Sequence, residues 1–194
     1  MFATLALLTA AQATSLATLD MAQLTDAADV IVRGTVTEIW TERDDAGMVW
    51  TVAQVEVASV FKGDDDTELL LVSQPGGQWG DRATHVLGVA RFSVGEDTYL
   101  FVDQNEAGRT LLVGMFQGKF NTQMDPHARE LVVTRFPVAV DAAFDHRFIP
   151  LPPADKRVTL SEFEVELIEM VADGWDGRPI PGLSSAELRR INGM

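Results

Sequence analysis

The chain has 194 residues, of which 46% are hydrophobic and 23% are charged, and its formal net charge is -14 at pH 7. This length and composition suit one folded domain with appendages and exclude a disordered chain. The acidic balance argues against nucleic acid as a partner, because nucleic-acid binding needs Lys and Arg to neutralise phosphates.

The first predicted element is an export signal over residues 1–13. A short apolar core from Phe2 to Ala10 precedes Ala11-Gln12-Ala13, the small-x-small pattern that signal peptidase reads. No Lys or Arg precedes the core, so the true start codon could lie upstream, and the alternative is a buried N-terminal helix. No run of residues is long enough to span a bilayer. We therefore expect a mature chain from Thr14, without membrane insertion, in the periplasm or outside the cell.

The mature chain is predicted to begin with a short helix capped by Asp20 and to continue as strands. Period-two alternation of β-branched residues marks the first two strands, and Gly34 predicts a bulge in the first. The expected strands cover residues 30–40, 49–61, 67–72, 97–102 and 110–116, with a further short strand over 130–136.

The C-terminal part, residues 139–194, is predicted to be an irregular segment followed by helices that pack on the preceding domain. Thr159 and Glu162 form a capping box, and Gly174 is a natural helix stop. A last short helix is expected from Ser184. The inward stripe of the main helix is expected to be Leu160, Phe163, Leu167, Met170 and Val171.

The number and length of the strands predict a mainly β fold for residues 14–138. Five main strands in an antiparallel meander favour a small barrel of the oligonucleotide- and oligosaccharide-binding (OB) type, with the C-terminal helix packed on it. The alternative is a two-sheet β-sandwich.

Three sequence phrases resemble known families. A-D-V-I-V-R-G-T-V over residues 28–36 and V-E-V-A-S-V-F-K-G over residues 55–63 resemble the first hairpin of netrin-like modules and tissue inhibitors of metalloproteinases. F-S-V-G-E-D-T-Y-L-F-V over residues 92–102 resembles uncharacterised exported bacterial domains. The resemblance implies the same small barrel with packed helices. The inhibitors chelate zinc through an N-terminal cysteine, and this chain has no cysteine, so their mechanism is not carried over.

The glycine-rich stretch S-Q-P-G-G-Q-W-G, residues 73–80, is the leading candidate for ligand contact. Neither a Walker loop nor a dinucleotide fingerprint fits its spacing, so a nucleotide site is not expected. We predict a long loop that leaves the third strand after Pro75, where the glycines supply positive φ. Trp79 either contacts a ligand or packs in the core, and Asp81, Arg82 and His85 complete the candidate ligand-binding set.

The sequence shows no catalytic constellation, no metal site and no cofactor motif. The three histidines are scattered, a Gly-x-Ser-x-Gly elbow is missing, and the run Asp64-Asp65-Asp66 lacks the alternate spacing of a calcium loop. The turn D-G-W-D-G after residue 172 suits either a cation-binding turn or a helix end.

Three functional hypotheses remain open. The first is an exported non-catalytic binding module that recognises a protein or a glycan. The second is a secreted hydrolase that uses Asp81 and His85, and the third is a structural domain of the envelope with no ligand. A perturbed His85 in a deep cleft would favour the hydrolase, and a contiguous exposed apolar patch would favour a protein partner.

Overall fold

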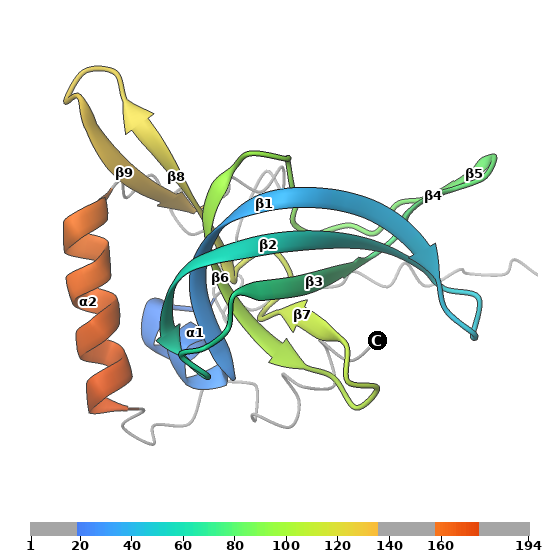
Figure 1. Cartoon of the computed structure of the whole chain (residues 1–194), viewed down its shortest axis with the longest axis horizontal. Helices are drawn as coiled ribbons and strands as arrows, with labels where there is room; N and C mark the ends of the chain where they lie inside the picture. The colour runs from blue at the N-terminus through green and yellow to red at the C-terminus, as the bar shows by residue number, and fades with distance from the viewer. Residues whose placement is uncertain (1–18, 136–157, 175–194) are drawn as a thin grey trace, which may run out of the picture.

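The computed structural model describes residues 19–135 and 158–174, and these form a mainly β structure with two helices. The main sheet has eight strands, and a separate two-stranded ribbon stands out from it (Figure 1). The elements in chain order are α1 (Met21–Ala27), β1 (Val30–Arg43), β2 (Val49–Lys62), β3 (Leu69–Pro75), β4 (Gly77–Trp79), β5 (Arg82–Thr84), β6 (Asp97–Gln104), β7 (Thr110–Leu112), β8 (Lys119–Asp125), β9 (Glu130–Arg135), β10 (Val158–Thr159) and α2 (Leu160–Asp173).

The strand pairings of the main sheet close on themselves. β1 pairs with β2, β2 with β3, β3 with β7, β7 with β6, and β6 again with β1. β8 pairs with the first half of β6, whereas β7 pairs with its second half. β9 and β10 continue the sheet beyond β8. The β3–β7 pairing, at Ser73 and Leu111, is parallel, whereas the others are antiparallel.

The prediction of five antiparallel strands is therefore not confirmed, whereas a mainly β fold with a C-terminal helix is confirmed. The main sheet has eight strands and one parallel pairing. β8 was missed because its sequence, K-F-N-T-Q-M-D, is rich in polar residues and lacks apolar alternation. β8 forms because β6 and β9 pair with it on both sides, so tertiary pairing outweighs local preference.

The expected irregularity at Gly34 is confirmed. The β1–β2 register shifts between Arg33 and Gly34. A Cβ atom at Gly34 would overlap the carbonyl oxygen of Glu56 on β2. Only glycine therefore allows β1 to lie this close to β2 at the register shift.

Two clusters of buried apolar side chains form the core. β6 contributes to both, because Tyr99 and Phe101 point to one face and Leu100 and Val102 to the other. The helix-side cluster lies between the sheet and the two helices, and the strand-side cluster lies among β1, β2, β3, β6 and β7. The helix-side cluster is Leu19, Leu24, Ala28, Ile31, Tyr99, Phe101, Val113, Phe120, Val133, Phe163 and Leu167. The strand-side cluster is Val32, Val36, Ala53, Val55, Val72, Ala90, Leu100, Val102 and Leu112.

Both predicted helix caps are confirmed. The side chains of Asp20 and Thr159 accept hydrogen bonds from the third residue of α1 and α2, and each helix has a complete capping box. Phe163 and Leu167 are buried, and α2 ends at Gly174 with a φ of 69°. The predicted stripe therefore attaches α2 to the sheet.

Several predictions fall on residues that the structure does not describe. The signal at residues 1–13, the irregular segment at 139–154 and the last helix from Ser184 lie outside the described ranges, as does most of the D-G-W-D-G turn. Among the described residues, no helix has the length and apolar character needed to cross a membrane.

Candidate functional site

Residues 77–84 form a hairpin, β4–β5, which we call the arm and which extends away from the main sheet (Figure 1). Its base is fixed to the β1–β2 hairpin by hydroxyl groups. Thr41 Oγ1 donates to the carbonyl oxygen of Gln78 at 2.8 Å, and Thr51 Oγ1 donates to that of Gly76 at 2.8 Å. The arm is thus an exposed element on a fixed base.

The glycines of the S-Q-P-G-G-Q-W-G stretch allow this attachment. Gly76 and Gly77 have φ values of 97° and 136°, which side chains rarely adopt. A Cβ atom on Gly77 would lie 2.6 Å from Thr51 Oγ1 and 2.8 Å from Thr41 Cγ2. The predicted end of β3 at Pro75 and the positive φ values are confirmed. The stretch forms a hairpin base and its first strand rather than an open loop.

The tip of the arm brings together three of the four predicted site residues. Trp79 and Arg82 face each other across the β4–β5 ladder, so their side chains are neighbours. The side chain of Trp79 is 47% exposed, and Asp81 and Arg82 are exposed beside it. Trp79 therefore does not pack in the core, which was the open alternative.

His85 lies at the base of the arm and does not join the tip. It follows β5, whereas Asp81 precedes β5, so this strand separates the two side chains. Both are exposed, and neither has a hydrogen bond or ion pair within the part of the chain that the structure describes. A general base must lie within hydrogen-bond reach of its partner. This geometry offers no support for an Asp81–His85 hydrolase.

The tip of the β1–β2 hairpin lies beside the base of the arm and was not predicted as part of the site. Asp44 closes this tip, because its carboxylate accepts hydrogen bonds from the Met48 N–H and from Trp50 Nε1, both at 2.8 Å. These two bonds hold the pKa of Asp44 below its usual range, and the bond from Trp50 makes the larger contribution. Met48 remains 44% exposed on this closed turn.

Arg109, in the turn between β6 and β7, braces the same hairpin. Its Nη1 atom lies 2.6 Å from Glu42 Oε1 and 3.1 Å from Ser73 Oγ. Its guanidinium carbon lies 4.6 Å from the centre of the Trp50 ring. Arg109 therefore links β1, β2 and β3 at the hairpin that supports the arm.

Two other networks of charged groups have their partners within the fold. Arg33 forms a two-pronged ion pair with Asp97, with a shortest contact of 2.7 Å. Tyr99 donates a 2.6 Å hydrogen bond to Glu164 of α2. Burial, followed by this bond, raises the pKa of Tyr99 well above its usual range. The network joins α2 to the sheet.

The second network centres on Lys119, which is completely buried. Its Nζ atom lies 2.9 Å from Glu96 Oε1 and 2.7 Å from Asn121 Oδ1. Burial lowers the pKa of Lys119, and the contact with Glu96 opposes that shift. Local sequence reasoning had no signal for this site, because β8 was not predicted as a strand and Glu96 is distant from Lys119 in the sequence.

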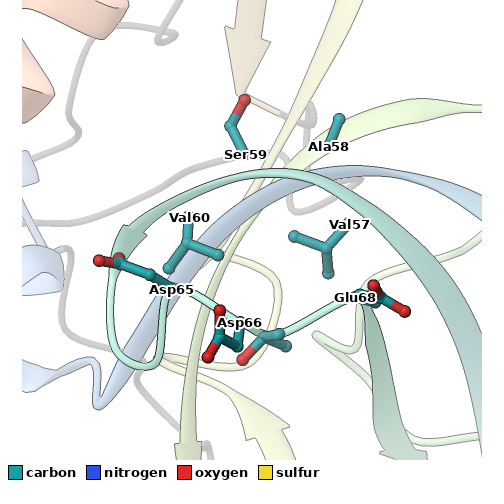
Figure 2. Close-up of a pocket in the computed structure, with 8 residues that line it drawn as sticks. Val57, Ala58, Ser59, Val60, Asp65, Asp66 and Glu68 are labelled. Carbon is teal, nitrogen blue, oxygen red and sulfur yellow. The ribbon is translucent and has the colours of Figure 1, made fainter.

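A hollow of about 420 Å³ lies between the end of β2 and the following turn (Figure 2). Its polar wall is acidic and carries Asp65, Asp66 and Glu68. Figure 2 shows Val57 and Val60 pointing toward this wall, whereas Ser59 points away. The turn that was predicted to be solvated is indeed exposed.

The carboxylates of the hollow do not form a recognisable metal site. No group of three or more His, Cys, Asp or Glu residues arranged to hold a metal ion occurs among residues 19–135 and 158–174.

Comparison with known proteins does not assign this chain to a family. No protein-family model matches the sequence, and the search of curated proteins finds no similar one.

Proposed function

We propose that the protein is an exported, non-catalytic binding module that recognises a protein partner through the tip of the arm. The observation that carries this proposal is a half-exposed tryptophan beside an arginine on a projecting hairpin with a fixed base. Trp and Arg are strongly enriched among residues that dominate the energy of protein interfaces.

The projecting shape of the arm favours a protein over a small ligand. Small-molecule sites are concave and surround most of their ligand. Trp79, Asp81 and Arg82 instead lie on an exposed ribbon (Figure 1), so the partner must supply the concave surface. A glycan that stacks on Trp79 is the competing outcome.

The β1–β2 tip extends this surface. Met48 is exposed at a turn that Asp44 and Arg43 close by hydrogen bonds. Thr41 and Thr51 of the same hairpin hold the arm. Because hydrogen bonds within the fold hold both hairpins, binding would lose little conformational entropy, and such preorganisation increases affinity.

The module proposed here is a small barrel of the OB type with netrin-like character. Its supports are the ring of pairings through β1, β2, β3, β7 and β6 and the resemblance of residues 28–36 and 55–63 to netrin-like hairpins. Inhibition of metalloproteinases is not proposed, because that mechanism needs an N-terminal cysteine and the chain has none.

Export to the periplasm or the medium is proposed from residues 1–13 and is tested separately. The full-length chain is expressed in a bacterial host, and the mature protein is sequenced from its N-terminus. We expect the mature chain to begin at Thr14. An intact Met1 on protein recovered only from the cytoplasm would contradict export.

The binding proposal is tested by capture with a tagged chain that begins at Thr14. Secreted and periplasmic fractions of the native host supply the partners. The test variant is Trp79→Ala, and the matched control is Met124→Ala, which removes a 59% exposed side chain from the β8–β9 hairpin at the other end of the molecule. A partner that is lost with Trp79→Ala and kept with Met124→Ala supports the proposal. A glycan captured in place of a protein, or equal capture by both variants, contradicts it.

A further inference from the structure

The segment that returns from the arm to the sheet, residues 85–96, contains no helix or strand. It is attached to the core mainly at its far end. Gly95 donates to the Val36 carbonyl at 2.8 Å, and Val36 donates to the Glu96 carbonyl at 3.0 Å. Ala90 is buried in the strand-side cluster, and Phe92 packs against that cluster. We call residues 85–96 the return segment.

Lys119 of β8 contacts two residues of this segment, Glu96 through an ion pair and Phe92 through its ring. Its ammonium group lies 2.9 Å from Glu96 Oε1 and 5.1 Å from the centre of the Phe92 ring. The side chain of Lys119 is 0% exposed and that of Glu96 is 17% exposed. Asn121 accepts a further hydrogen bond from the ammonium group at 2.7 Å. One buried cation thus fixes two residues of the return segment against β8.

A buried lysine is a costly way to fill this space. An ammonium group loses its hydration on burial, and well-packed apolar side chains often stabilise a core as well or better. A charge pair with one carboxylate has direction, however, and it penalises any other placement of that carboxylate. Such a pair suits a residue whose role is to set the position of a segment.

We propose that Lys119 is a positioning residue that fixes the return segment and thereby the base of the arm. This inference rests on the proposed role of the arm in binding. The arm and the return segment that follows it then have two attachments: Thr41 and Thr51 hold the entry of the arm, and Lys119 holds the far end of the return segment through Glu96 and Phe92.

Amide hydrogen exchange in the free protein tests this proposal. The variant Lys119→Met keeps the length of the side chain and removes its charge, so Glu96 loses its partner. We expect amides of residues 88–96 to exchange about tenfold to a hundredfold faster, because breaking a buried ion pair favours local opening. The control Leu167→Ala lowers global stability through the helix-side cluster, which does not include the return segment.

A second readout uses 5-fluorotryptophan and the fluorine resonance of Trp79, with Trp50 as the internal reference. Lys119→Met is expected to shift or broaden the Trp79 signal, whereas Leu167→Ala is expected to leave it unchanged. If Lys119→Met fails to fold, Glu96→Gln supplies the milder break of the same pair, with a smaller acceleration of exchange at residues 88–96.

The proposal is overturned if exchange at residues 88–96 follows global stability in the same way for both variants, or if the Trp79 signal does not respond to Lys119→Met. Since the assay contains no binding partner, its failure leaves the proposed binding function unaffected. Conversely, a failure of partner capture does not change the exchange result.

Discussion

At the end of the molecule that carries α2, the contacts are apolar side chains and a shared ion network, whereas at the arm end they are hydroxyl groups, glycines and backbone carbonyls. Phe163 and Leu167 of α2 are buried against the sheet, and Glu164 joins Tyr99 and Arg33. The arm is held by Thr41 and Thr51. The first kind of contact stabilises the fold, and the second holds an exposed element in place while contributing little apolar burial.

The largest expected difference between the two ends is in global stability. Leu167→Ala leaves a cavity in the helix-side cluster, where Leu167 is fully buried. We expect the free energy of unfolding, measured in urea, to fall by about 3 kcal/mol, and amide exchange in the arm to stay unchanged. A loss below about 1 kcal/mol would show that α2 is not an integral part of the core.

Two glycines of the arm, Gly77 and Gly80, both have positive φ, so substitutions at these positions can be compared directly. Gly77→Ala places a methyl group against Thr51 Oγ1 and Thr41 Cγ2 at a φ of 136°, whereas Gly80 at a φ of 59° has nothing within 4 Å. We expect Gly77→Ala to cost about 2 kcal/mol and to release the arm. Gly80→Ala is expected to cost about 1 kcal/mol and to keep the arm attached. Amide exchange at Gly76, whose N–H donates to the Val49 carbonyl at 2.8 Å, measures attachment, and equal exchange in the two variants would contradict this account of the base.

A smaller loss of stability is expected when a residue of the ion network that joins α2 to the sheet is replaced. Tyr99→Phe removes the 2.6 Å hydrogen bond to Glu164, while Arg33 still lies near that carboxylate. We expect a loss of about 1 kcal/mol in the free energy of unfolding. Glu164→Gln in the Tyr99→Phe background should then cost less than it does in the wild type, because the two residues share one interaction. Additive losses would argue against the shared bond.

Local sequence signals were sufficient for features that depend on neighbouring residues. The caps at Asp20 and Thr159 were predictable because a capping box involves only residues within one stretch of four. The bend at Gly34 was predictable because glycine interrupts a β-branched run. The hairpin of β1 and β2 was likewise evident from alternation and a turn between them.

Features that depend on distant residues were not predictable from the sequence. β4 and β5 lack apolar alternation, and they form where two glycines allow close contact with the β1–β2 hairpin. Arg109 contacts Glu42, which is 67 residues away in the sequence. The exposure of Trp79 was undecidable because a tryptophan near a glycine-rich turn suits either a core or a surface, and only the projection of the arm decides between them.

The central claim is that Trp79 on the arm contacts a protein partner, and an equilibrium binding titration tests it most directly. The captured partner is titrated against the wild type, Trp79→Ala and Met124→Ala, with the stability of each variant measured alongside. Because Trp79 lies outside both core clusters, stability should change by less than about 0.5 kcal/mol. We predict a Kd at least about 30-fold weaker for Trp79→Ala and an unchanged Kd for Met124→Ala. Equal affinities for all three proteins would contradict the claim.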